Sequence, residues 1–220
     1  MKQLLTTFAA ILVASVTSLV HAQDVKGNVI AGEKKVALCM GCHGILGFHI
    51  GFPEVYQVPK ISGQGAKYIV TALTEYKKGE RKNPTMRAIA ESLTAQDMAD
   101  VAAFYSSHGV VPGATLPAKA REPSAEVAAL ITKAGCTSCH GENFAKPIDP
   151  TYPKIAGQHS DYLFFALKAY KTEGKPMIGR ANPIMGAMVK QFSNAELQLL
   201  ADYVGSLDGD LKTLQQPRLR

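Results

Sequence analysis

The feature that most constrains this chain is a five-residue pattern, Cys-x-x-Cys-His, which occurs twice. The first copy is CMGCH at residues 39–43, and the second is CTSCH at residues 136–140. Two thiols three residues apart on one helical turn can add to the two vinyl groups of a single porphyrin, and the adjoining histidine then lies beneath the iron. Each copy therefore predicts one covalently attached haem c. The thioether bonds would come from Cys39, Cys42, Cys136 and Cys139.

Other uses of paired cysteines fit this chain less well. Zinc ribbons place their two Cys-x-x-Cys pairs about 15–20 residues apart, whereas nearly half of this chain separates Cys39 from Cys136. A thioredoxin-like dithiol would need strands alternating with helices around it, and the sequence shows no such alternation. Local disulfides within each pair remain the alternative if no haem is attached.

Length and composition favour two small domains over one large domain. The chain has 220 residues, and its apolar fraction of 46% is ordinary for a soluble globular protein. Each half has only about a hundred residues, close to the size at which a hydrophobic core becomes marginal. A buried haem would supply much of the missing apolar core, so we expect the protein without haem to be poorly folded.

The first 22 residues have the pattern of an export signal. Lys2 gives a positive start, residues 4–20 are largely apolar, and a small residue precedes Gln23. A signal peptidase would cleave there, so the mature chain would begin at Gln23 and, in a bacterium, reach the periplasm. An uncleaved membrane anchor is the alternative, because the apolar stretch is close to the shortest that spans a bilayer.

Aligning the two halves on the Cys-x-x-Cys-His motifs reveals an internal duplication. PKISGQ at residues 59–64 recurs as PKIAGQ at 153–158, and NPTM at 83–86 recurs as NPIM at 182–185. The preserved order and similar spacing predict two similar folds in tandem. A proline-containing stretch without apolar periodicity lies between them and predicts an extended linker. The expected units are a signal peptide at 1–22, a first domain at 23–109, a linker at 110–123 and a second domain at 124–220.

The coarse pattern within each half is helical. Apolar periodicity predicts helices at 29–38, 66–78 and 95–107, and again at 125–134, 160–172 and 194–207. Gly32 and Ala129 occupy corresponding positions in the two opening helices, where a small residue permits a close crossing. Each closing helix should begin with a capping box, formed by Thr94 with Asp97 and by Ser193 with Glu196.

As a set, the export signal, the two haem motifs, the repeated PxIxGQ and the methionine before each closing helix resemble the dihaem cytochrome c4 family. The resemblance covers essentially the whole mature chain. It implies an all-α fold of two tandem cytochrome c domains, each wrapped around one haem, with the haems near the domain interface. It also implies a periplasmic electron carrier between respiratory-chain donors and a terminal oxidase or similar acceptor.

Methionines are the candidates for the axial iron ligand opposite His43 and His140. Met86 and Met185 each follow Asn-Pro and precede a closing helix, the place that the ligand methionine occupies in the family. A thioether ligand favours ferrous iron and fills the last coordination position, which suits an electron carrier. Met188 is the alternative to Met185, but it has no counterpart in the other half.

The resemblance also assigns a role to the proline that begins each repeated PxIxGQ. The backbone carbonyls of Pro59 and Pro153 would accept hydrogen bonds from His43 and His140, which fixes the orientation of each ring. Each proline can also form a rigid turn, and this is compatible with the hydrogen-bonding role of its carbonyl. Two pairs of tyrosines recur as well and either line the haem pockets or pack in the cores, namely Tyr68 with Tyr162 and Tyr76 with Tyr170.

Charge argues against nucleic-acid binding. The formal net charge of +6 falls when Lys2 leaves with the signal and falls further with the haem propionates, so the loaded protein is only weakly positive. Two groups of basic residues could steer docking onto acidic redox proteins, although such groups are more often solvated faces. They are Lys77, Lys78, Arg81 and Lys82 in the first half and Lys168, Lys171, Lys175 and Arg180 in the second.

The expected partners are redox proteins, such as a membrane-bound terminal oxidase, a cytochrome bc complex or a dehydrogenase. A peripheral association with the membrane is left open. We expect an electron-transfer protein with no catalytic residues, because the two Asn-Pro-x-Met segments match. A dihaem thiosulfate dehydrogenase or peroxidase, which needs one accessible iron, remains an alternative, as does the cytochrome subunit of a dehydrogenase complex.

The segment at residues 44–56 is longer than its counterpart after His140, and it would shape either a haem edge or a partner site.

Overall fold

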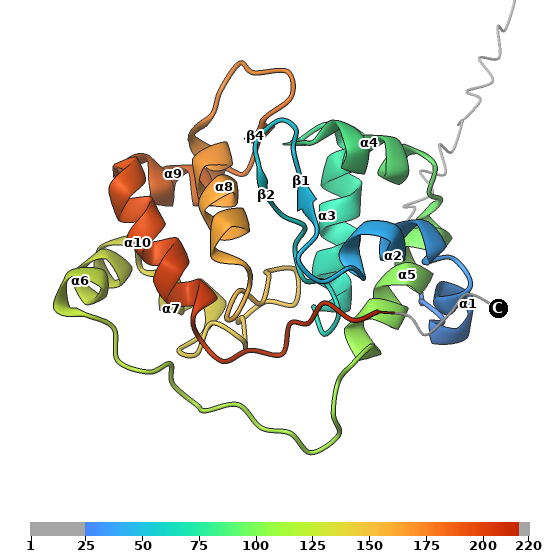
Figure 1. Ribbon diagram of the computed structural model, residues 1–220, viewed down its shortest axis with the longest axis horizontal. Coiled ribbons are helices and arrows are strands. Elements are labelled where there is room, and N and C mark those ends of the chain that lie inside the picture. Colours follow the sequence, from blue (N-terminus) through green and yellow to red (C-terminus); the bar gives the residue numbers. More distant parts are fainter. Residues whose placement is uncertain (1–24, 216–220) are drawn as a thin grey trace, which may run out of the picture.

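Two groups of helices lie side by side in the computed structural model, which describes residues 25–215. A long extended connector joins them and sweeps along one side of the molecule (Figure 1). The predicted signal peptide at 1–22 lies outside the described residues. Within the described part, no helix is both long enough and apolar enough to cross a membrane.

The elements of the two groups follow each other in a similar order, and the four strands have only two residues each. The first group contains α1 (Val29–Glu33), α2 (Ala37–His43), β1 (His49–Ile50), β2 (Tyr56–Gln57), α3 (Ala66–Lys78), β3 (Arg81–Lys82), α4 (Pro84–Glu91) and α5 (Ala95–Ser107). The second contains α6 (Ala125–Ala134), α7 (Cys136–His140), α8 (Ser160–Lys171), β4 (Gly179–Arg180), α9 (Pro183–Lys190) and α10 (Asn194–Gly205).

The helices predicted from periodicity are present, with one break and three additions, one of which, α7, is the second Cys-x-x-Cys-His motif itself. Helices α3, α5 and α6 have the predicted bounds, and both capping boxes are formed. The single helix predicted at 29–38 is wrong, because the chain leaves the helix between α1 and α2. That turn buries Val36 completely and brings Lys35 within 2.6 Å of Asp100 on α5. Helices α4 and α9 were not predicted, although an asparagine caps each and a proline opens it.

The close crossing expected of the opening helices exists in the first domain only. A Cβ added at Gly32 would collide with the carbonyl oxygen of Asp100 and with Phe104, so α1 lies directly against the backbone of α5. Ala129 is exposed on α6. The expectation was wrong there because α6 turns larger residues, Val127 and Leu130 among them, toward its core.

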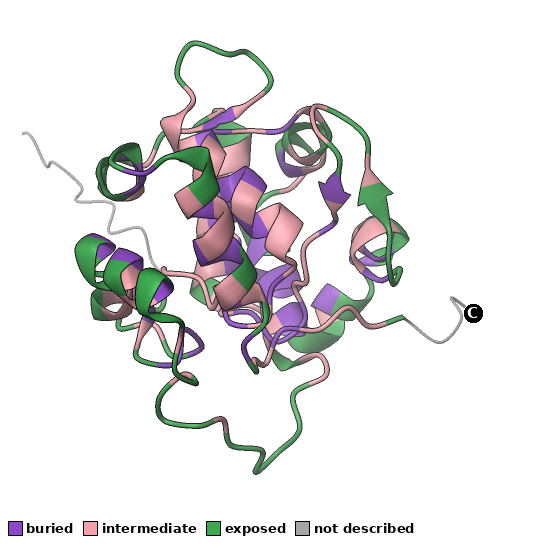
Figure 2. Ribbon diagram, turned by 60° about the vertical axis from the view of Figure 1, so that its left-hand side comes forward, coloured by how far each residue is buried: buried purple, intermediate pink, exposed green. Residues whose placement is uncertain are grey.

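Each domain has a hydrophobic core of its own. In the first, residues of α2, α3 and α5 pack together, with Met98 among them. In the second, two adjoining clusters gather around α8 and α10. Figure 2 shows the buried residues on the inward sides of the helices and exposed residues along the connector.

The two copies of the repeated PxIxGQ motif contact each other across the domain interface. The Gln64 side chain donates to the Lys154 carbonyl and accepts from the Lys154 amide, both at 2.9 Å. Gln158 makes the same two bonds to the backbone of Lys60, again at 2.9 Å. Both glutamine side chains are buried. The halves are therefore related by an approximate two-fold axis that passes through this motif.

Two further contacts hold the domains together. Strands β3 and β4 pair antiparallel, with Arg81 opposite Arg180. The segment after α10 crosses back to the first domain, where the Lys212 amide donates to the Ser62 carbonyl at 3.0 Å and the Lys212 ammonium donates to the Gly109 carbonyl at 3.1 Å.

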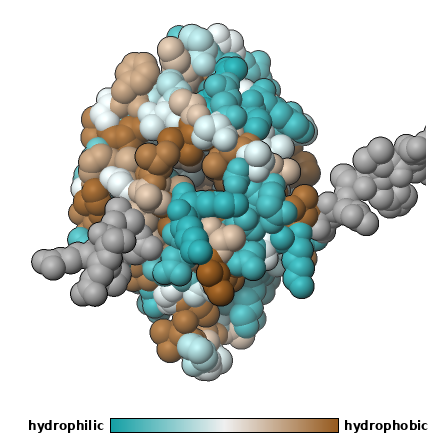
Figure 3. Space-filling view, turned by 90° about the vertical axis from the view of Figure 1, so that its right-hand side faces the viewer, coloured by the Kyte–Doolittle hydropathy of each residue, from teal (hydrophilic) through white to brown (hydrophobic). Residues whose placement is uncertain are grey.

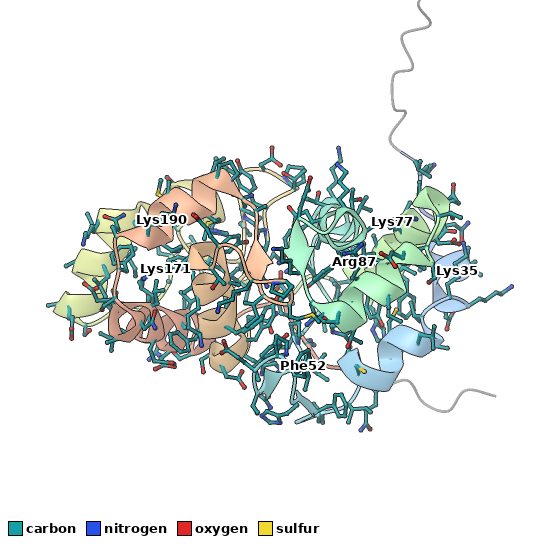
Figure 4. All side chains as sticks on the ribbon, turned by 90° about the horizontal axis from the view of Figure 1, so that it is seen from above. Lys35, Phe52, Lys77, Arg87, Lys171 and Lys190 are labelled. Atoms are coloured by element: carbon teal, nitrogen blue, oxygen red, sulfur yellow. The ribbon has the colours of Figure 1, made fainter. Side chains whose placement is uncertain are left out.

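Residues 44–56, whose role the sequence left open, also join the two domains. They form the short β1–β2 pair, and Glu54 makes an ion pair of 2.5 Å with Lys168 on α8. The ring of Tyr56 stacks on Phe165, also on α8, with centroids 4.2 Å apart. Phe52, which is labelled in Figure 4, belongs to this segment and is 60% exposed.

Candidate haem sites

The histidines of the two Cys-x-x-Cys-His motifs have the same hydrogen-bond geometry. His43 ends α2, and its Nδ1 lies 2.8 Å from the Pro59 carbonyl oxygen; His140 ends α7, and its Nδ1 lies 3.1 Å from the Pro153 carbonyl oxygen. A carbonyl only accepts, so Nδ1 carries the proton and Nε2 keeps its lone pair free for a metal. Burial lowers the pKa of both histidines, and the bonds to the proline carbonyls oppose this only partly.

The four motif cysteines are half-buried and line a cavity. None of them forms a disulfide in the described structure. Burial raises the pKa of the Cys39 thiol, and it raises the pKa of the Cys136 thiol to about 11. At neutral pH these two thiols are therefore protonated, and they face the same space as the histidines.

That cavity has a volume of about 810 Å³ and is lined by residues of both domains. Its walls are largely apolar, with Leu73 and Val101 in the first domain and Leu163 and Leu200 in the second. Each domain contributes two thiols and one imidazole to the cavity, with the thioether of Met86 in the first domain and those of Met185 and Met188 in the second. This donor set is the one that holds a haem c, so the residues present fit two such groups.

The methionines of the two Asn-Pro-x-Met segments lie in the first turns of α4 and α9. The Asn83 side-chain oxygen accepts a hydrogen bond from the Met86 amide at 2.9 Å, and the Asn182 oxygen accepts from the Met185 amide at 3.0 Å. Asparagine thus caps each helix while proline opens it. Met86 and Met185 are partly buried against the cores, whereas Met188 is 38% exposed.

Sequence reasoning missed a pair of arginine sites at the cavity. Arg81 is 4% exposed, and its guanidinium donates to the Tyr68 hydroxyl at 2.9 Å; Arg180 donates to the Tyr162 hydroxyl at 3.0 Å. The Nε of Arg81 is buried and has no hydrogen-bond partner among the described residues. The carboxylate of a haem propionate would satisfy such a donor. The sequence signal for this arrangement is the repeated tyrosine pair, because each arginine donates a hydrogen bond to one of these tyrosines.

These positions change the interpretation of the two basic groups. Arg81 and Arg180 face the cavity and do not belong to a solvated docking face. Lys77 and Lys171, which lie in opposite halves (Figure 4), donate to the carbonyls of Leu93 and Phe192 at 2.5 Å each. Both lysines therefore tie the end of a helix to the turn before the closing helix.

Comparisons with known proteins agree with this architecture. The cytochrome c family model matches residues 29–108 and 124–208. Cytochrome c4 of Azotobacter vinelandii is 29% identical, over 90% of this chain and 96% of that protein. The thiosulfate dehydrogenase electron acceptor of Stutzerimonas stutzeri is 28% identical, over 89% of this chain and 92% of that protein. The crystal structure of reduced recombinant cytochrome c4 from Pseudomonas stutzeri matches this fold with a TM-score of 0.57 and 27% sequence identity. The match covers 83% of this chain and 100% of the cytochrome c4 chain.

The prediction of an all-α fold with two tandem cytochrome c domains is thus confirmed, as is that of two covalently bound haems c. The family match spans both domains, and the relatives named above cover nearly the whole chain. The chain belongs to the cytochrome c family and is an electron-transfer protein of the dihaem cytochrome c4 type.

Proposed function

We propose that this protein is a periplasmic electron carrier in which each haem iron is held between a histidine and a methionine. The ligands are His43 with Met86 in the first domain and His140 with Met185 in the second. The paired geometry carries the proposal. In each domain the histidine keeps Nε2 free, and the methionine is fixed at a helix start beside the same cavity.

The residues around each site have separate tasks. A bound haem c supplies one-electron exchange between ferric and ferrous iron. The cysteine pairs, Cys39 with Cys42 and Cys136 with Cys139, anchor it through thioethers, and the carbonyls of Pro59 and Pro153 orient the histidines. The methionines would supply the last ligand to each iron and thereby exclude substrate. For this reason we propose no catalytic residue and favour a carrier over a dihaem enzyme.

The matched residues also support the domain limits and the location that we propose. A first domain at 23–109, a linker at 110–123 and a second domain at 124–220 enclose the two ranges of the family match, 29–108 and 124–208. A signal peptide at 1–22, with its positive start and apolar stretch, would deliver the chain to the periplasm.

The partners that we propose are redox proteins, with a membrane-bound terminal oxidase, a cytochrome bc complex or a dehydrogenase among them. Two relatives are thiosulfate dehydrogenase electron acceptors, which favours such an enzyme as one electron donor. The face of the first domain in Figure 3 mixes polar and apolar side chains.

Replacement of each methionine by alanine tests the axial ligands. Met86→Ala and Met185→Ala should each remove about half of the weak red absorption band of methionine-ligated ferric haem. Each should also lower one of two reduction potentials and let carbon monoxide bind rapidly to one reduced haem.

Met188→Ala is the matched control, since it removes a methionine from the same helix, α9. It should leave the band and both potentials unchanged. A normal spectrum in Met86→Ala, or loss of the band in Met188→Ala with a normal spectrum in Met185→Ala, would refute the proposed ligand set. Rapid carbon monoxide binding to the unaltered protein would instead favour the enzyme.

A further inference from the structure

One buried tyrosine breaks the two-fold symmetry of the haem sites. Tyr56 lies on β2, within the segment that has no counterpart of equal length in the second domain, and it is 4% exposed. Its ring stacks on Phe165 of α8, with 4.2 Å between centroids and 22° between planes. When α3 and α8 are aligned on their shared tyrosines, Thr71 occupies the position of Phe165. The first domain therefore offers no equivalent ring.

The hydroxyl of Tyr56 contacts the asparagine that caps the helix of Met86. Asn83 is 6% exposed, and its Nδ2 donates to the Tyr56 hydroxyl at 3.1 Å. The other end of the same amide, Oδ1, accepts from the Met86 amide at 2.9 Å. Phe165, Tyr56, Asn83 and Met86 thus form one continuous chain of contacts that begins in the second domain and ends at the proposed ligand of the first.

The second domain has only half of this arrangement. Asn182 caps Met185 in the same way, at 3.0 Å, but its Nδ2 has no hydrogen-bond partner among residues 25–215. Rotation of the Asn83 amide would break two hydrogen bonds, whereas rotation of the Asn182 amide would break one. The start of α4 is consequently held more firmly than the start of α9, and its extra bond depends on the packing of the domains.

On this basis we propose that Tyr56 is a positioning residue that makes iron ligation by Met86 depend on the docked second domain, through a side-chain contact that Met185 lacks. The inference rests on the proposed function, since it takes Met86 as the ligand. If Tyr56 loses its hydroxyl, Asn83 loses one of its two restraints. Met86 then becomes easier to displace from the iron.

Competition by imidazole for the ferric iron measures this directly in the intact, haem-loaded protein. Tyr56→Phe keeps the ring stacked and removes only the hydroxyl. It should increase the affinity of the first-domain haem for imidazole about fivefold, the change expected from one buried hydrogen bond. Phe165→Leu should also increase affinity at the first-domain haem, although it alters the other domain. Met86→Ala and Met185→Ala identify which haem gives which signal.

Tyr203→Phe is the matched control, because it removes a tyrosine hydroxyl that donates to the Arg121 carbonyl at 2.6 Å, outside the cavity lining. It should leave both affinities unchanged, and an unaltered second-domain signal shows that each variant is folded. Equal changes at both haems, or a change at the second-domain haem alone, would overturn the inference. If Met86→Ala removes methionine ligation while Tyr56→Phe and Phe165→Leu have no effect, only this inference fails. If Met86→Ala has no effect, the ligand set itself fails.

Discussion

The two domains are alike at their motif histidines, capped methionines and interface glutamines, and they differ in their opening helices and in the Tyr56 segment. Gln64 and Gln158 make identical bonds across the interface. Gly32, by contrast, allows α1 to touch α5, while Ala129 at the same position is exposed. The comparison teaches that the shared features serve the haem sites and the two-fold interface, whereas the cores have diverged.

The largest effect should come from removal of one pair of thioether cysteines. Cys39→Ala with Cys42→Ala, or Cys136→Ala with Cys139→Ala, should leave a protein with half of the haem absorbance and an unfolded or loosened altered domain, because the haem forms much of that core. Haem content and limited proteolysis measure both effects. Full haem content in either variant would contradict the assigned attachment sites. Resistance to proteolysis in only one would show that the domains depend unequally on haem.

The next effect should appear in the first domain alone. Gly32→Ala places a methyl group against the backbone of α5, and backbone cannot move aside as a side chain can. We expect a loss of about 3 kcal/mol in the free energy of unfolding. The reverse change at the matched position, Ala129→Gly, should cost only about 0.5–1 kcal/mol through helix propensity. Chemical denaturation of the loaded protein measures both, and equal losses would contradict the difference between the opening helices.

The interface should respond symmetrically. Gln64→Ala and Gln158→Ala each remove three hydrogen bonds, two to a lysine backbone across the interface and one to the amide of the next residue. Each should therefore cost about 1–2 kcal/mol. Thermal unfolding and small-angle scattering would report the loss and any separation of the domains. If one variant lost clearly more stability than the other, the two glutamines would be equivalent in geometry but not in their contribution to the free energy of unfolding.

The smallest expected effect is on the stability of the protein at acidic pH. Hydrogen bonds from Lys35 are the main cause that lowers the pKa of Asp97 and of Asp100 below their usual range. A carboxyl group whose pKa is lower in the folded state than in the unfolded state stabilises the fold at pH values above its unfolded pKa, about 4. That stabilisation is lost as the pH falls through the pKa of the folded state. Lys35→Gln should therefore reduce the fall in melting temperature between pH 6 and 3. An unchanged fall would show that Lys35 has no part in it.

Much of each haem site was predictable from the sequence because its parts lie close together along the chain. Cys39, Cys42 and His43 share one helix, and Asn83 and Met86 share one helix start, so fixed spacing encodes the local geometry. Capping residues such as Thr94 marked helix ends for the same reason. The break before Val36 was not predictable, because it depends on Asp100, far along the chain.

The sequence alone therefore determined two haem motifs, two similar helical domains and a methionine before each closing helix. Only the tertiary structure decided that Gln64 meets Lys154, that Arg81 is buried at the cavity and that Tyr56 reaches Phe165. The physical reason is that these contacts join surfaces of two separately folded units. Their partners are chosen by shape and hydrogen bonding in space, and no spacing along the chain records that choice.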